Sequence, residues 1–189
     1  MPGTEATLRG GPARPLAHCA LALADEPPHA PIPDLVAALE PQLILLLGDL
    51  EPAWTDGLAE IDLPKLGVRG NHDAPDALEA VGAADLHLRV VEQGGLTFAG
   101  FGWTAEEEAS GLLSGLPGAD VLLTHVPPAG VNDHPDDPVH CGSPALLAWV
   151  EEHEPRVLLH GHTLPVMPIH QLGPTRIVYV RGATPVELG

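Results

Sequence analysis

Short apolar runs alternate with polar stretches along most of the chain. The runs contain few polar positions, whereas a strand with one face in water would alternate apolar and polar residues. Continuous apolar runs of this length are typical of strands that are buried on both faces. We therefore expect eight strands, over residues 17–24, 43–47, 66–68, 88–91, 96–101, 121–123, 157–159 and 177–180.

Helices are expected between several of these runs. Asp34 can cap a helix that ends before Pro41. Ser143 followed by Pro144 is a favourable pair of residues for a helix start. Strands that alternate with helices predict an α/β fold with layered elements and a mixed sheet. The helices are expected over 34–40, 76–81, 106–113 and 143–153, and a hairpin turn is expected at Gly94-Gly95.

The N-terminal region has two possible interpretations. Arginines precede an apolar run, over 16–24, that ends in Ala-Leu-Ala, and this arrangement resembles a secretory signal. We favour a first strand instead, because cleavage there would remove core residues just before Asp25. We expect residues 1–15 to form a disordered leader, and residues 16–189 to form a single domain of the 189-residue chain.

Composition excludes several classes of function. Lysine and arginine number 8 against 26 acidic residues, which gives a net charge of −18 and no basic cluster for duplex nucleic acid or a membrane surface. No apolar run is long enough to span a membrane. Two cysteines suggest a reducing compartment, so a cytoplasmic location is expected. Eleven histidines with surplus carboxylates favour a transition-metal site.

Polar residues with metal-binding side chains follow five of the expected strands. In an open α/β sheet, the loops at the carboxyl ends of the strands form the ligand crevice. Each motif alone is common in turns, but their order and placement together favour one shared site. The motifs are Asp25, Gly48-Asp49, Gly70-Asn71-His72-Asp73, Thr124-His125 and His160-Gly161-His162-Thr163.

This ordered set resembles the calcineurin-like metallophosphoesterase family over nearly the whole chain behind the leader. Gly70-Asn71-His72-Asp73 is the most specific motif. A small bacterial phosphodiesterase-like branch is resembled by the loop His125-Val126-Pro127-Pro128, followed by His140-Cys141-Gly142-Ser143 and by Pro155. The resemblance implies an α/β, layered β-sandwich flanked by helices. It also implies divalent ions at the ends of the strands, which would neutralise a phosphoester and activate a water molecule.

The resemblance also implies a role for each residue. Asp49 would be shared by two ions, and Asp25 would bind one of them. His72 would assist the leaving group as a catalytic residue, and Asp73 would orient it. Mixed nitrogen and oxygen donors suit Mn, Fe, Zn, Co or Ni. The remaining ligands of the second ion would be Asn71, His125 and His162, with Asn71 and His140 as candidates for substrate binding.

The sequence departs from the family pattern at two positions. Pro27 and Leu164 stand where the family has histidine ligands, and both losses fall on the ion that Asp25 would hold. Reading the last motif from His160 instead would supply a further histidine. Because both of its partner ligands are missing, Asp25 itself could be only a turn residue. Other donors near in sequence are Glu26 and His29.

Three functions remain open from the sequence. The first is a metal-dependent phosphoester hydrolase that acts on small or nucleotide-like substrates, most simply as a phosphodiesterase. The second is a degenerate member that binds one metal ion or a phosphate ligand without significant catalysis. The third is a protein-interaction scaffold, which has no chemical reason to keep Asn71 and His72. The sequence does not predict the metal, the natural substrate or the oligomeric state.

Overall fold

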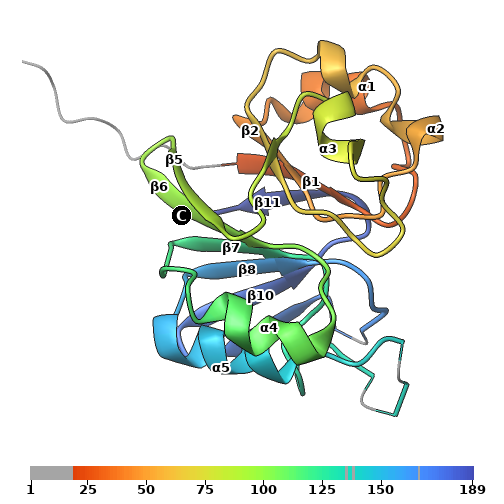
Figure 1. Ribbon diagram of the computed structural model, residues 1–189. Helices are drawn as coiled ribbons and strands as arrows, with labels where there is room; N and C mark the ends of the chain where they lie inside the picture. The colour runs from red at the N-terminus through yellow and green to blue at the C-terminus, as the bar shows by residue number, and fades with distance from the viewer. Residues whose placement is uncertain (1–18, 135, 138, 166) are drawn as a thin grey trace, which may run out of the picture.

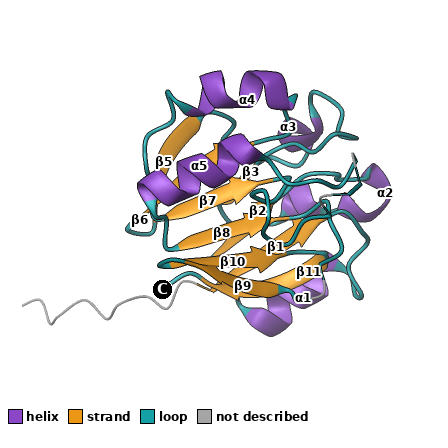
Figure 2. Cartoon of the chain, turned by 90° about the horizontal axis from the view of Figure 1, so that it is seen from below, coloured by secondary structure: helices purple, strands orange, loops and turns teal. Residues whose placement is uncertain are grey.

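The computed structural model describes residues 19–134, 136–137, 139–165 and 167–189. Two β-sheets face each other, and helices cover their outer sides (Figure 1). This is the layered α/β sandwich that the sequence predicts. Seen from below, α5 (Pro144–His153) lies across the strands of one of these sheets (Figure 2). The expected leader over 1–15 lies outside the described residues.

The first sheet has five strands in the order β11-β1-β2-β3-β4. β1 to β4 run parallel, and β11 pairs antiparallel with β1 at one edge. The parallel order brings the carboxyl ends of β1, β2 and β3 to the same edge of the sheet. The strands are β1 (Cys19–Ala24), β2 (Leu43–Leu46), β3 (Lys65–Gly67), β4 (Ala84–Asp85) and β11 (Gly182–Glu187).

The second sheet has six strands in the order β5-β6-β7-β8-β10-β9. Its four central strands run parallel, and the edge strands β5 and β9 are antiparallel to their neighbours. The strands are β5 (Arg89–Gln93), β6 (Leu96–Phe101), β7 (Val121–Thr124), β8 (Val157–His160), β9 (Ile169–Leu172) and β10 (Thr175–Tyr179).

The helices lie on the outer faces of the sandwich (Figure 1). α4 and α5 cover the second sheet, where Trp149 and Leu113 join one buried apolar cluster. α1 and α3 pack on the first sheet through Leu35 and Leu78. The helices are α1 (Ile32–Leu39), α2 (Pro52–Thr55), the 3₁₀ helix η1 (Leu58–Glu60), α3 (Ala77–Ala80), α4 (Glu106–Leu113) and α5 (Pro144–His153).

The main core lies between the two sheets. Ala22 and Leu45 of the first sheet and Phe98, Leu123 and Leu159 of the second belong to one cluster of buried residues. These strands also have buried side chains on their outer faces, so they are apolar at nearly every position. Burial on both faces explains the continuous apolar runs in the sequence.

Helix boundaries test the capping predictions. Ser143 caps α5 as predicted, because its Oγ accepts a hydrogen bond from the Leu146 amide at 3.1 Å. The cap predicted at Asp34 is wrong: α1 begins at Ile32 after Pro31, and Asp34 lies in its first turn. A proline in the first turn fits a helix start, since its missing N–H is unpaired there anyway. None of the helices in the described part of the chain has both the length and the hydropathy to cross a membrane.

Candidate metal centre

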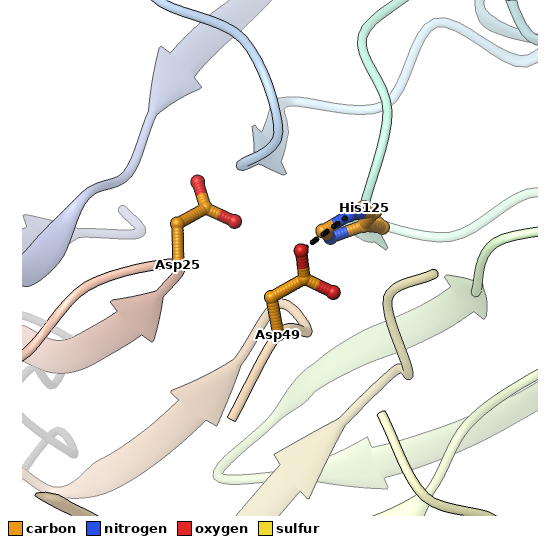
Figure 3. Close-up of side chains that lie close together, drawn as sticks. All are labelled: Asp25, Asp49 and His125. Carbon is orange, nitrogen blue, oxygen red and sulfur yellow. Dashed lines mark ion pairs between the residues drawn. The ribbon is translucent and has the colours of Figure 1, made fainter. Parts of the chain in front are cut away.

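The loops after β1, β2, β3, β7 and β8 meet at one edge of the sandwich. The Asp25 amide donates to the Gly48 carbonyl at 3.3 Å, and the Gly161 amide donates to the His125 carbonyl at 3.0 Å. Donor atoms of Asp25, Asp49 and His125 lie within 4.8 Å of one another (Figure 3). Three of the five sequence motifs therefore form a compact group that could hold a metal ion.

His125 is held as a neutral imidazole with one nitrogen directed into this group. Its Nδ1 lies 2.8 Å from the Leu47 carbonyl oxygen, which can only accept, so Nδ1 carries the proton. Burial lowers the pKa of His125, which keeps the ring neutral. The unprotonated Nε2 then faces Asn71 Oδ1 at 2.9 Å and Asp49 Oδ2 at 3.6 Å. A histidine bound to a metal ion is oriented in the same way, by a hydrogen bond at its other nitrogen.

Asp25 supplies a second sign that the site fits a cation. Its Oδ1 is buried and has no hydrogen-bond partner among the described residues. Burial, with the nearby charge of Asp49, raises the pKa of Asp25 to about 7. A buried carboxylate oxygen without a partner is costly unless a proton or a cation compensates it. The donors present are carboxylate, imidazole and amide groups, which suit a divalent transition metal.

His162 lies beside this group on the loop after β8. Its amide donates to Asp25 Oδ2 at 2.8 Å, and its ring centroid lies 4.8 Å from that of His125. The His162 Nε2 donates to the Val139 carbonyl at 2.7 Å, so Nδ1 is the nitrogen with a free lone pair. His140, predicted to contact substrate, lies next to it with ring centroids 5.3 Å apart and binds Asp137 at 2.7 Å.

His160 does not fit the predicted role of a metal ligand. It is fully buried, and its Nδ1 donates to the Gly161 carbonyl at 2.9 Å. Its Nε2 faces the Asn132 side-chain nitrogen at 3.1 Å, which makes Nε2 the acceptor. Burial lowers the pKa of His160 to about 4. Both ring nitrogens of His160 are therefore engaged in hydrogen bonds, one with Gly161 and the other with Asn132. Neither of these hydrogen bonds directs a nitrogen towards Asp49.

Asp73 connects the loop after β3 to the loop after β2 through hydrogen bonds. Its carboxylate accepts hydrogen bonds from the amides of Asp49 at 2.8 Å, Leu50 at 2.6 Å and Gly70 at 2.7 Å. This contact sets the position of Asp49, a role that the sequence did not indicate. The predicted role of Asp73, orienting the His72 ring, stays a prediction.

His72 lies at the open side of the site. Its backbone amide donates to Asp49 Oδ1 at 3.0 Å, and its side chain is exposed. Together with Asp25 and Asp49 it lines a cleft of about 610 Å³ that extends towards α2 and α3. A substrate in this cleft would contact His72 and the metal-binding group at the same time.

Backbone strain is concentrated at the same edge. Asp25, Asp49 and His162 have φ values of 61°, 55° and 68°, a left-handed conformation that costs free energy in residues other than glycine. A Cβ atom on Gly70 would lie 2.2 Å from Asp49 Oδ1, so only glycine fits there. Strained residues of this kind persist where the surrounding structure holds functional side chains in place.

The sequence prediction did not include Arg181 or Tyr179 in the site. Arg181 forms an ion pair with Glu26, directly after Asp25. Burial, with the nearby charge of the Asp25 carboxylate, raises the pKa of the Tyr179 phenol to about 12. Neither residue stands in a recognisable motif, and the pairing of β11 with β1 that places Arg181 was not predicted.

Comparisons with known proteins agree with this geometry. The calcineurin-like phosphoesterase family matches residues 28–166. The fold is similar to the crystal structure of TT1561 of Thermus thermophilus, with a TM-score of 0.63 and 16% identity, covering 92% of this chain and 100% of that one. It is also similar to an archaeal phosphodiesterase, with a TM-score of 0.51 and 12% identity over 85% of this chain and 82% of that one.

A third similar structure is GAP50, the anchor in the inner membrane complex of Plasmodium. Its TM-score is 0.53 with 12% identity, over 85% of this chain and 70% of that one. A search of curated protein sequences finds no match. At these identities the structures establish the fold alone, whereas the family match covers most of the chain. The chain belongs to the calcineurin-like phosphoesterase family.

Proposed function

We propose that this protein is a metal-dependent phosphoester hydrolase that acts as a phosphodiesterase on small or nucleotide-like substrates. We further propose a cytoplasmic location, manganese as a suitable metal, and one or two bound ions. Family membership supports phosphoester hydrolysis in general and the use of divalent ions. The observation that carries the proposal is the group of Asp25, Asp49 and His125 donor atoms within 4.8 Å, beside a cleft lined by His72.

The metal-binding residues would be Asp49, Asn71 and His125, with Asp25 and His162 at their sides. A bound divalent ion supplies positive charge for the phosphoryl oxygens and lowers the pKa of a water molecule. The chain prepares this site by keeping His125 neutral and its Nε2 unprotonated. In His162 the two ring nitrogens have the opposite roles. Its Nε2 donates a hydrogen bond to the Val139 carbonyl, and its Nδ1 is left to bind a metal ion.

The charge of the cleft also favours metal dependence. Its walls carry the carboxylates of Asp25, Asp49, Glu51, Asp56 and Asp76, and no lysine or arginine lines it among the described residues. An anionic phosphoester would be repelled by these walls. A cation at the Asp49 group would reverse the local charge where the phosphate must lie.

His72 is the residue that we assign to the leaving group. It is exposed at the cleft, so a substrate oxygen can reach its ring, and histidine is the side chain that most often acts as a general acid. Its backbone amide donates to Asp49 Oδ1 at 3.0 Å. This hydrogen bond holds His72, the proposed general acid, close to the metal-binding carboxylate of Asp49. Protonation of the leaving oxygen by His72 lowers the barrier to breaking the phosphorus–oxygen bond.

Hydrolysis assays with manganese test this function. We expect turnover of bis-p-nitrophenyl phosphate that exceeds turnover of the p-nitrophenyl monoester, and a decrease of about 10²–10⁴-fold in the His72→Ala variant. His170→Ala, in the edge strand β9, is the control and should retain activity. Turnover that is equal in the wild type and His72→Ala, across a screen of metals and esters, would reject the proposal.

A second candidate is a protein that binds one metal ion or a phosphate ligand without significant catalysis. Pro27 and Leu164 favour it, because neither side chain can donate to a metal ion near Asp25. Metal analysis combined with the same assays separates the two. A tightly bound ion without turnover supports the binding protein, and a bound ion with His72-dependent turnover supports the enzyme.

A further inference from the structure

The two sides of Asp25 differ in the groups that they offer. On the side of Asp49 and His125, donor atoms converge and can hold a cation. On the other side Glu26 is the nearest carboxylate in sequence, and it is engaged by the Arg181 guanidinium in an ion pair. The residue that follows Asp25 is therefore already paired with a cation, the guanidinium of Arg181.

The position of Arg181 follows from strand pairing. β1 and β11 are antiparallel, and Ala24 is opposite Gly182. The next residue of the first strand is Asp25, and the preceding residue of the second is Arg181, so the two are brought to the same end of the sheet. The charges of Arg181 and Asp25 act on each other, since Arg181 lowers the pKa of Asp25 and Asp25 raises the pKa of Arg181.

While Glu26 is paired with Arg181, the remaining neighbours do not offer a ligand set for another cation. Tyr179 stays a neutral phenol, because burial and the charge of Asp25 raise its pKa to about 12. The two nitrogens of His160 bind Gly161 and Asn132. Pro27 and Leu164 carry no donor atom. A second divalent ion here would have to displace Arg181 from Glu26 and lie beside its positive charge.

We propose that Arg181 takes the place of a second metal ion, so that this site binds one divalent ion and uses the guanidinium as the fixed cation next to Asp25. This inference rests on the proposed function, because it concerns the same metal-binding group. The single ion would be held by Asp49, Asn71 and His125, with the unpartnered Asp25 Oδ1 available at its side. Arg181 would balance the remaining charge of Asp25 and Glu26.

Metal content per chain tests the proposal directly. The protein is saturated with manganese, separated from free metal by gel filtration and analysed by mass spectrometry for bound manganese. We expect one ion in the wild type and one in Arg181→Lys, which keeps the charge. Arg181→Gln, which frees Glu26, should rise towards two ions, and the double variant Arg181→Gln/Glu26→Gln should return to one.

Arg89→Gln is the matched control, because Arg89 is exposed on β5 and makes no contact with this group in the described structure; it should keep one ion. Two ions in the wild type would overturn the proposal, as would one ion in a folded Arg181→Gln protein. If Arg181→Gln fails to fold, the wild-type and Arg181→Lys contents still decide between one ion and two.

Activity separates this inference from the function on which it rests. A wild type with two ions and His72-dependent turnover would contradict the role of Arg181 and support the hydrolase. A wild type with one ion and no turnover would support the role of Arg181 and contradict the hydrolase. A wild type that binds no divalent ion would overturn both.

Discussion

The Nε2 atom of His125 lies 2.9 Å from Oδ1 of Asn71, although the two residues are 54 positions apart in the chain. The His125 proton is on Nδ1, where it is donated to the Leu47 carbonyl. Two electron-rich atoms therefore face each other across this distance. A cation placed against both would remove their repulsion, so we expect a bound metal ion to stabilise this pair.

Replacement of Asn71 by alanine should weaken metal binding. The variant loses one oxygen donor but keeps the orientation of His125, which depends on Leu47. We expect the affinity for manganese to fall by at least about 10-fold, as is common when a metal site loses a supporting contact. Calorimetric titration measures this change. Gln42→Ala, an exposed amide next to β2, should leave the affinity unchanged, and an Asn71→Ala affinity equal to that of the wild type would count against the ligand set.

Asp73 should contribute strongly to stability through its three backbone contacts. Asp73→Ala leaves the amides of Asp49, Leu50 and Gly70 without their acceptor. Unpaired amides in partly buried loops are costly, so we expect a loss of about 2–4 kcal/mol in the free energy of unfolding. Urea unfolding measures it.

Asp76→Ala is the control for that experiment. Asp76 precedes α3 but makes no side-chain hydrogen bond to cap it. Its removal should therefore change the free energy of unfolding by less than about 0.5 kcal/mol. Equal effects of the two substitutions would show that Asp73 does not hold the two loops together.

The buried His160 predicts how stability depends on pH. Its pKa is lowered from 6.5 to about 4 by burial, so the unfolded chain takes up a proton at a higher pH than the folded one. The contribution is fully present above pH 6.5 and is lost as the pH falls towards 4. The loss amounts to roughly 3 kcal/mol, since each unit of pKa difference corresponds to about 1.4 kcal/mol.

Urea unfolding at several pH values, on metal-free protein, tests this relationship. His160→Gln removes the titrating group, so its free energy of unfolding should depend less on pH between 6.5 and 4 than that of the wild type. His29→Gln, at an exposed position, should keep the wild-type slope. Parallel curves for the wild type and His160→Gln would mean that His160 does not control this transition.

Alanine substitutions at Gly70 and Gly111 should have opposite effects on stability. A Cβ at Gly70 would lie 2.2 Å from Asp49 Oδ1, whereas nothing lies within 4 Å of a Cβ at Gly111 in α4. Gly70→Ala should therefore displace the Asp49 carboxylate, lower manganese affinity and destabilise the fold. Gly111→Ala should stabilise the protein by about 0.5–1 kcal/mol, because alanine favours the helix. Thermal unfolding with and without manganese distinguishes the two, and a Gly70→Ala protein with unchanged metal affinity would contradict the packing argument.

Continuous apolar runs made the central strands predictable, since burial on both faces leaves a clear pattern. The polar residues at the strand ends were equally visible, and Asp25, Asp49 and His125 do come together. β11 was not predicted, because its alternating residues form an edge strand that includes Pro185. Without that strand, the approach of Arg181 to Glu26 and Asp25 could not be foreseen.

Side-chain direction was the other limit of the sequence. His160 and His162 flank the same glycine, and their order alone does not say which ring faces Asp25 and His125. The structure decides this through the left-handed conformation of His162 and the burial of His160 between Gly161 and Asn132. Asp73 is a similar case, because its contacts with three amides depend on the meeting of two loops.

An anomalous-scattering map from crystals of the full chain grown with manganese shows directly whether a metal ion binds at this edge of the sandwich. We predict a peak in contact with donor atoms of Asp49, Asn71 and His125, at the open edge beside His72. A fully occupied manganese ion elsewhere on the molecule, or no peak at this edge under saturating metal, would contradict a metal centre at these residues.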